Sequence, residues 1–256
     1  MRLPPMSAAL PALILAAGRG ERMRPLTDIT PKPLLAVRGK PLIEWHLEAL
    51  AEGGVREVVV NTAWLEEQIV DTLGDGARWG LRIRFSREGR DHGGALETAG
   101  GIAKALPCLG ECFWIVAGDV FLPGFCFDAA TGASFAAGDR LAHLWLVPNA
   151  PHHPQGDFGI DAHGLASLDA RPWLTWASVG LMRDGLVDGV LAGQRSPLRP
   201  HLHAALAAGR IGAERYEGAW TDVGTPQRLA ALNAPDGVAA TALCSPSVPP
   251  LAKDLF

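Results

Sequence analysis

The sequence predicts a single α/β domain built on a doubly wound, mostly parallel mixed sheet, and three observations carry this prediction. Residues 12–17 form a short, unbroken apolar run, which is typical of a strand buried on both faces of a parallel sheet. Strand-like and helix-like patterns then alternate along the first third of the chain, which implies right-handed crossovers. A second apolar run over residues 113–119 ends in Gly118-Asp119. Because ligands bind outside the carboxyl ends of such strands, we expect the functional residues at that edge.

The spacing of apolar residues predicts the elements in order. Apolar residues at helical spacing between Leu42 and Leu50 predict a helix, which Gly53-Gly54 ends. The remaining expected strands cover residues 55–61, 81–85, 141–147, 173–182 and 211–216, and the remaining expected helices cover 62–73, 200–209 and 227–232. A further loop and helix begin around residues 93–101.

Composition narrows the class of protein. The chain has 256 residues, of which 48% are hydrophobic, so it can bury a sizeable core in one domain. A net charge of −4 argues against a general nucleic-acid binder, which normally carries a basic face. Four scattered cysteines favour the reducing cytoplasm, and no apolar segment reaches the roughly 18 residues of a membrane span. We expect residues 1–11 to be an N-terminal extension and residues 234–256 a disordered tail. The oligomeric state stays open.

A glycine turn and two cations follow the first strand. Gly18 and Gly20 allow the backbone to approach a ligand closely, and the N–H groups of such a turn suit phosphate oxygens. Arg22 and Lys32 follow at fixed offsets, and Lys32 stands between two prolines. The glycines alone fit a tight strand-to-helix turn equally well, because Met23 stands where a dinucleotide fingerprint requires a small residue.

The complete string is more specific than its glycines. It resembles the signature of the sugar-1-phosphate nucleotidyltransferases at Gly18, Gly20, Arg22, Met23, Pro25, Leu26, Thr27, Pro31, Lys32 and Pro33. The resemblance covers residues 12–233 and implies a Rossmann-like nucleotidyltransferase fold. It also implies transfer of a nucleoside monophosphate from an NTP to a sugar-1-phosphate, with release of pyrophosphate and with Mg²⁺ as cofactor.

The resemblance assigns roles to individual residues. It implies that Arg22 holds the leaving pyrophosphate, and that Lys32 holds the α-phosphate or the incoming phosphate. The implied nucleotide-binding residues are Leu15, Ala16, Ala17, Gly18, Gly20, Glu97, Thr98, Ala99 and Gly100. The implied Mg²⁺ ligands are Asp119 and Asp222, each of which could instead serve a turn or a helix cap.

Two further segments suggest a branch of the family. Residues 96–101 and the loop of Gly156, Asp157 and Phe158, the implied sugar-binding residues, resemble the branch that uses UTP and N-acetylmuramic acid-1-phosphate in cell-wall recycling. A mannose-1-phosphate guanylyltransferase and a glucose-1-phosphate thymidylyl- or uridylyltransferase are also compatible with the motifs. A function of another class is that of a regulatory module that senses nucleotide sugars without catalysis.

Overall fold

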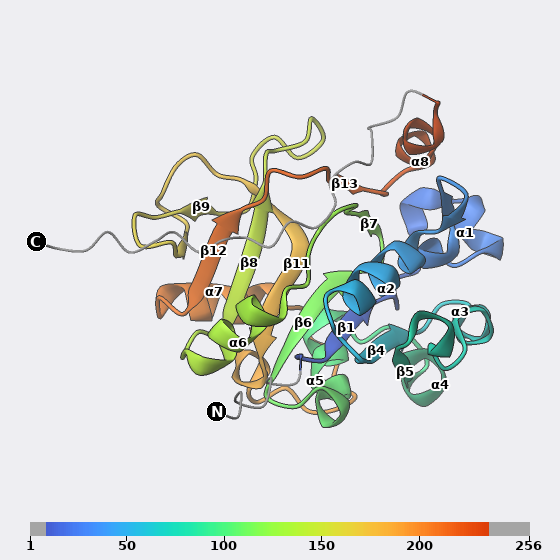
Figure 1. Ribbon diagram of the computed structural model, residues 1–256, viewed down its shortest axis with the longest axis horizontal. Helices are drawn as coiled ribbons and strands as arrows, with labels where there is room; N and C mark the ends of the chain where they lie inside the picture. Colours follow the sequence, from blue (N-terminus) through green and yellow to red (C-terminus); the bar gives the residue numbers. More distant parts are fainter. Residues whose placement is uncertain (1–8, 236–256) are drawn as a thin grey trace, which may run out of the picture.

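The structure, a computed structural model, describes residues 9–235 (Figure 1). Most of the expected N-terminal extension and of the expected disordered tail lies outside these residues. The main sheet has seven strands, β1 (Ala12–Leu15), β4 (Glu57–Thr62), β5 (Arg82–Arg87), β6 (Cys112–Ala117), β8 (Ala142–Val147), β11 (Thr175–Arg183) and β12 (Ile211–Arg215). Their order across the sheet is β12-β8-β11-β6-β1-β4-β5.

The sheet is mixed but mostly parallel. Strand β1 is parallel to both of its neighbours, β4 and β6, and the pairs β4–β5 and β8–β12 are parallel as well. Only β11 among these seven strands runs antiparallel to its neighbours, β6 and β8. The predicted fold class is therefore confirmed.

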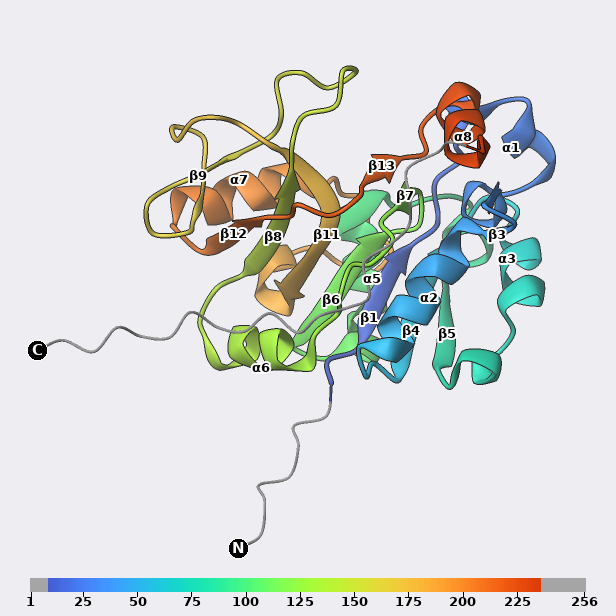
Figure 2. The ribbon, with the colours of Figure 1, turned by 45° about the horizontal axis from the view of Figure 1, so that its top comes forward.

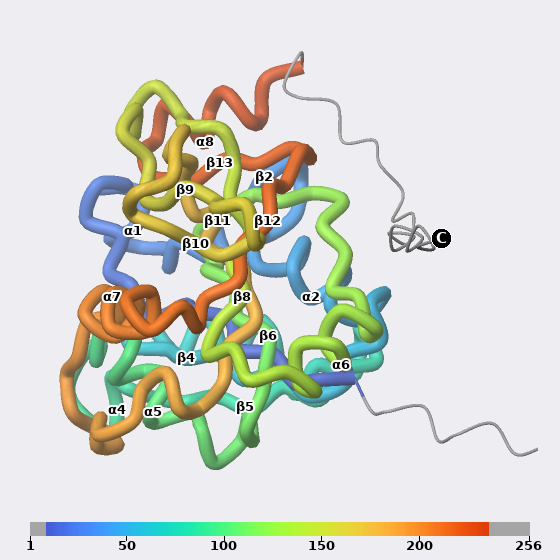
Figure 3. The backbone as a smooth tube through the Cα atoms, turned by 90° about the vertical axis from the view of Figure 1, so that its left-hand side faces the viewer, coloured from blue at the N-terminus to red at the C-terminus, as the bar shows by residue number. Residues whose placement is uncertain are grey.

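Helices cover both faces of the sheet (Figure 3). They are α1 (Leu26–Ile29), α2 (Leu42–Glu52), α3 (Glu66–Leu73), α4 (Glu88–His92), α5 (Glu97–Leu109), α6 (Ala129–Ala137), α7 (Arg199–Ala207) and α8 (Pro226–Asn233), with 3₁₀ turns at Glu21–Met23, Lys32–Leu34, Ala77–Trp79 and Asp184–Val187. Successive residues of β1 face opposite cores, because Ile14 belongs to the core that includes residues of α2, α3 and α6, while Leu13 belongs to the core that includes residues of α5 and α7. Burial on both faces explains why this strand is an unbroken apolar run.

Three short two-stranded ladders complete the fold. They are β2 (Ala36–Val37) with β3 (Lys40–Pro41), β9 (Gly159–Ile160) with β10 (Ala166–Ser167), and β7 (Val120–Phe121) with β13 (Thr221–Asp222). The ladder of β7 and β13 brings the backbone of Asp222 close to that of Asp119. Helix α8 follows it and lies near α1 at one end of the molecule (Figure 2). There Leu232 of α8 joins a small core with Met23 and Phe121.

The structure corrects some predicted boundaries. The helix expected over residues 62–73 begins only at Glu66, because Thr62 still pairs with Arg87 in the ladder of β4 and β5. The predicted helix over residues 200–209 is α7, which ends two residues earlier at Ala207. Helix α4 was not predicted, since its five residues carry no apolar spacing. No helix within residues 9–235 combines the length and the apolar character that crossing a bilayer requires.

Candidate active site

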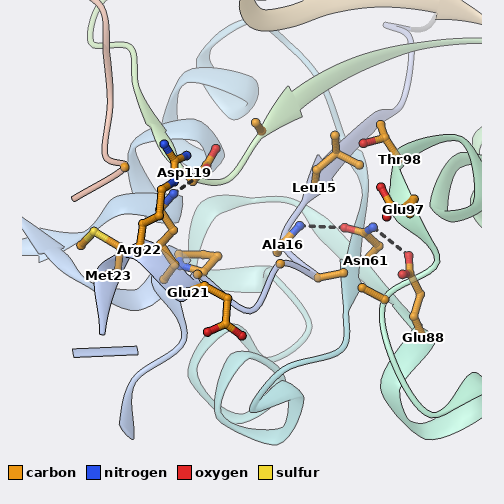
Figure 4. A pocket seen from close by; sticks show the side chains of 18 of the residues that line it. Leu15, Ala16, Glu21, Arg22, Met23, Asn61, Glu88, Glu97, Thr98 and Asp119 are labelled. Atoms are coloured by element: carbon orange, nitrogen blue, oxygen red, sulfur yellow. Dashed lines mark hydrogen bonds and ion pairs between the residues drawn. The ribbon is translucent and has the colours of Figure 1, made fainter. Parts of the chain in front are cut away.

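A cavity of about 460 Å³ opens at the carboxyl ends of β1, β4, β5 and β6 (Figure 4). Many of the site residues predicted from the sequence line it, namely Leu15, Ala16, Ala17, Gly18, Gly20, Arg22, Lys32, Glu97, Thr98 and Asp119. Residues that the sequence did not single out complete the lining, including Asn61, Glu88 and Arg195. The edge of the sheet that the sequence pointed to therefore carries a cavity large enough for a small ligand.

The surroundings of Gly18 and Gly20 in the turn differ. A Cβ at Gly18 would meet no atom within 4 Å, so the space in front of this residue is open. Gly20 has a φ of +68°, and a Cβ there would lie 2.9 Å from Cγ2 of Thr27. The Thr27 hydroxyl also donates to the Gly20 carbonyl oxygen over 2.9 Å. The fold itself requires Gly20, whereas Gly18 leaves room for a ligand.

Trp64, in the connection between β4 and α3, stabilises the turn that contains Gly18 and Gly20. Its indole N–H donates to the Thr27 carbonyl oxygen over 2.8 Å, and the Arg19 guanidinium carbon lies 3.7 Å from the centroid of its ring. Arg19 donates to the same carbonyl and to Asp28. These contacts hold the turn from outside the cavity, so its lining atoms stay available.

The two predicted cations differ in their surroundings. Lys32 is only 8% exposed, and its Nζ lies 2.6 Å from Oδ2 of Asp119. Arg22 is exposed, lines the cavity, and makes no hydrogen bond or ion pair with any residue of the described part of the chain. One cation is thus already paired with a carboxylate, and the other is available to an incoming anion.

The opposite wall of the cavity is the start of α5. Glu97 has a φ of +63°, which is unusual for a residue with a side chain, and its Oε1 accepts from Nη2 of Arg195 over 2.8 Å. Glu97 and Thr98 line the cavity, whereas Ala99 and Gly100 are buried and do not. The Gly100 N–H donates to the carbonyl oxygen of Ser196, so it is engaged within the protein.

The ladder of β7 and β13 brings the backbone of Asp222 close to that of Asp119, which directly precedes β7. Asp222 is opposite Val120, and the Val223 N–H donates to the Asp119 carbonyl oxygen over 2.8 Å. The Asp119 side chain is 43% exposed and, within residues 9–235, accepts a hydrogen bond only from Lys32. Oδ1 of Asp222 is buried without a hydrogen bond. Such oxygens suit Mg²⁺, which completes its shell with water and phosphate oxygens, so the predicted pair fits this ion.

Protein groups already contact the carboxylate of Asp222. Arg228 donates to Oδ2, and Nε2 of His152 lies 2.8 Å from Oδ1 in a geometry that makes no hydrogen bond. Asp222 does not line the described cavity, although Gly224 does. No cluster of three or more His, Cys, Asp or Glu able to hold a metal occurs within the described residues, so the ligands would include the two aspartates and substrate oxygens.

The predicted sugar-binding residues lie outside the described cavity. Asp157 holds its own loop, since its carboxylate accepts from the Trp176 N–H over 2.8 Å and lies 3.1 Å from Nε2 of His153. Phe158 is buried, and a Cβ at Gly156 would lie 2.7 Å from Oδ1 of Asn149. A sugar-binding role for these residues stays a prediction.

Two buried polar residues near the cavity escaped the sequence analysis. Nε2–H of His46 donates to the Val120 carbonyl oxygen over 2.9 Å, and burial lowers the pKa of His46 to about 4. Glu88 is fully buried, and this burial raises the pKa of its carboxyl. His46 lies within a helix pattern and Glu88 follows a strand with alternating arginines, so the surrounding sequence marks neither residue as part of a site. The sequence around Asn61 does mark it, because this polar residue directly follows a run of three valines.

Comparison with known proteins supports the resemblance. The family model described as nucleotidyl transferase matches residues 11–164. An N-acetylmuramate alpha-1-phosphate uridylyltransferase from Neisseria meningitidis is 49% identical over 222 residues, which cover 85% of this chain and 94% of that protein. A protein of the same name from Caulobacter vibrioides is 33% identical over 87% of this chain and 95% of its own length. A UTP–glucose-1-phosphate uridylyltransferase from Synechocystis is 37% identical over 83% of this chain and 60% of its own length.

The fold also matches a solved structure. A putative glucose-1-phosphate thymidylyltransferase from Bacillus anthracis superposes with a TM-score of 0.73, over 88% of this chain and 94% of that one, at 19% identity. That likeness concerns the fold alone, and the sequence relatives carry the assignment of the activity class. The chain belongs to the nucleotidyl transferase family, as one of its sugar-1-phosphate nucleotidyltransferases.

Proposed function

We propose that this enzyme transfers uridine monophosphate from UTP to N-acetylmuramic acid-1-phosphate and releases pyrophosphate. The observation that carries this choice of substrates is the 49% identity, over 94% of its length, to a relative named for that reaction. The nucleotide sugar formed would serve peptidoglycan recycling. A cytoplasmic location accompanies the proposal, because the cell makes and holds UTP there.

The reaction needs no general base from the protein. The nucleophile is an oxygen of a phosphate monoester, whose second pKa of about 6 leaves it largely ionised at neutral pH. The protein must bring two polyanions together in line and neutralise their charge. A cavity with an unpaired arginine, a buried lysine and a turn rich in backbone N–H groups supports such a role.

Several of the lining residues have a place in this scheme. Arg22 would bind the pyrophosphate that leaves, and Lys32 would bind the α-phosphate or the incoming phosphate. The backbone N–H groups around Gly18 would bind phosphate oxygens, because the space in front of this residue is open. Glu97 and Thr98 on the opposite wall would contact the nucleobase and ribose.

Mg²⁺ is part of the proposal, and Asp119 and Asp222 would hold it. The ion would supply positive charge to the phosphates as negative charge redistributes during transfer. The residues fit because Asp119 directly precedes β7, Asp222 lies on β13 opposite Val120, and each carboxylate has an oxygen without a hydrogen bond.

The test is a matrix of nucleoside triphosphates against sugar-1-phosphates, with Mg²⁺ titrated and released pyrophosphate measured. We expect the highest kcat/KM for UTP with N-acetylmuramic acid-1-phosphate. A higher value for UTP with glucose-1-phosphate would favour the activity named for the Synechocystis relative. A higher value for GTP with mannose-1-phosphate would indicate a guanylyltransferase, and one for dTTP with glucose-1-phosphate would indicate a thymidylyltransferase. Binding of nucleotide sugar without any turnover would indicate a regulatory module.

A further inference from the structure

A chain of buried hydrogen bonds runs across the carboxyl edge of three neighbouring strands. Strands β1, β4 and β5 are parallel; Ala16 and Glu88 directly follow β1 and β5, and Asn61 is the last residue but one of β4. The Ala16 N–H donates to Oδ1 of Asn61 over 2.7 Å, and Nδ2 of Asn61 donates to Oε1 of Glu88 over 2.8 Å (Figure 4). The glycine turn is thereby tied to residues two strands away.

The chain continues to the opposite wall of the cavity. Oε2 of Glu88 accepts from the Leu96 N–H over 2.7 Å. Leu96 directly precedes Glu97 and Thr98, which line the cavity. The two walls that would hold the phosphates and the nucleobase are therefore joined through two side chains.

The two side chains of this hydrogen-bond chain are buried and closely packed. Glu88 is 0% exposed and Asn61 is 3% exposed. A Cβ on Gly101 of α5 would lie 2.7 Å from Oε1 of Glu88 and 2.8 Å from Nδ2 of Asn61, so a side chain there would displace these groups. Burying a carboxylate is costly, and well-packed apolar residues commonly stabilise a fold at least as well. General stability therefore does not explain this group.

The backbone groups at the two ends of this hydrogen-bond chain determine which side-chain atoms donate and which accept. Backbone N–H groups of Ala16 and Leu96 can only donate. Asn61 must then present its oxygen to Ala16 and its amide nitrogen to Glu88, and Glu88 must accept at both oxygens. A neutral amide in place of Glu88 would put a donor against a donor at one end.

We propose that Asn61 and Glu88 are positioning residues that hold the glycine turn and residues 95–98 at the spacing that one nucleotide requires. This inference rests on the proposed function. These hydrogen bonds join the two walls of the nucleotide cavity. Their loss should therefore raise the KM for UTP and leave the KM for the sugar phosphate nearly unchanged.

Because the direction of each hydrogen bond is fixed, exchanging the amide of Asn61 with the carboxylate of Glu88 tests the proposal. Glu88→Gln alone opposes two donors, and Asn61→Asp alone opposes two carboxylate oxygens. In the double variant Asn61→Asp/Glu88→Gln, Asp accepts from Ala16 and from the new amide, whose oxygen accepts from Leu96. Every donor again has an acceptor, so the exchange restores the chain of hydrogen bonds between the two walls.

We expect each single variant to raise the KM for UTP about 10- to 100-fold, the range for an unsatisfied charged hydrogen bond. The double variant is expected to return to within a few-fold of the unmodified enzyme. Glu66→Gln is the matched control, since Glu66 is a buried glutamate that does not line the cavity. Calorimetric binding of UTP and the melting temperature are measured for every protein.

The outcomes separate this inference from the proposed function. A double variant as impaired as the worse single variant, or one that does not fold, overturns the inference. So does an equal rise in the KM of both substrates, or a loss in UTP affinity that Glu66→Gln reproduces. If the unmodified enzyme releases no pyrophosphate from UTP with any sugar phosphate, the proposed function has failed. In that case the same exchange is measured on binding of the nucleotide that the matrix identifies, and lack of rescue there overturns the inference.

Discussion

Nζ of Lys32 lies 2.6 Å from Oδ2 of Asp119, although the family resemblance implies a phosphate partner for the lysine and a metal ion for the aspartate. The two opposite charges pair in the lining of the cavity in the absence of substrate. An incoming phosphate and its cation would each find a partner of opposite charge already in place. The pair therefore keeps a nearly buried lysine compatible with the fold in the absence of ligand.

Lys32→Met should reduce turnover strongly. It removes the cation that we propose to bind the transferring phosphoryl group, and loss of one such electrostatic group typically lowers kcat by about 10²–10³. Steady-state release of pyrophosphate measures the effect. Lys40→Met is the control, because Lys40 also pairs with a carboxylate, that of Glu48, but lies outside the cavity. Equal losses in both variants would contradict the assigned role.

Arg22→Ala should leave stability unchanged and lower kcat together with kcat/KM. Arg22 is exposed and makes no hydrogen bond or ion pair within residues 9–235, so the fold loses nothing when it is truncated. Its charge would act on the departing pyrophosphate, where negative charge increases in the transition state. Melting temperature and steady-state kinetics are compared with those of Arg24→Ala, an exposed arginine paired with Asp28. A change in the KM for UTP alone would indicate binding of the ground state only.

Gly18→Ala and Gly20→Ala should have opposite signatures. A methyl group at Gly18 meets no protein atom, so this variant should melt like the unmodified enzyme but bind UTP more weakly. A methyl group at Gly20 requires a φ near +68° and contacts Thr27, so this variant should lose about 1 kcal/mol or more of folding free energy. Denaturant titration and UTP binding distinguish the two. Normal UTP affinity in Gly18→Ala would show that no phosphate approaches there.

His46 should make the folding free energy fall in mild acid. Its pKa of about 4 in the folded state lies below the 6.5 of the unfolded chain, so the unfolded chain takes up the proton first as the pH falls. The resulting loss of folding free energy is negligible above pH 6.5 and grows to about 3 kcal/mol near pH 4. His46→Gln keeps a donor for the Val120 carbonyl but does not titrate. Denaturant titrations at about pH 7 and about pH 4.5 should show a smaller acid loss in the variant, and parallel pH profiles would refute the prediction.

The sequence predicted those parts of the molecule that local pattern determines. The unbroken apolar run of β1 indicated a strand buried on both faces, and the structure confirms the mixed sheet around it. The string from Gly18 to Lys32 placed the glycine turn and both cations, and the cavity contains all of them. The family assignment from that string is also confirmed.

Contacts between distant segments could not be predicted in this way. Asn61 reaches Ala16 only because β4 lies beside β1, and Glu88 reaches Asn61 only because β5 lies beside β4. Strand order of this kind is a property of the whole fold and leaves no mark in the spacing around either residue. The contact of His152 with Asp222 has the same origin, since a loop and the β13 ladder meet there.

The ladder of β7 and β13 joins positions about a hundred residues apart in the chain. Closing so long a segment costs more entropy than forming contacts between neighbours, while two residues of pairing return little free energy. We therefore expect this ladder to be among the last contacts made when the denatured enzyme refolds. Helix content would recover first, and the two aspartates would come together only in the final step. Assembly of the catalytic apparatus would then coincide with completion of the fold.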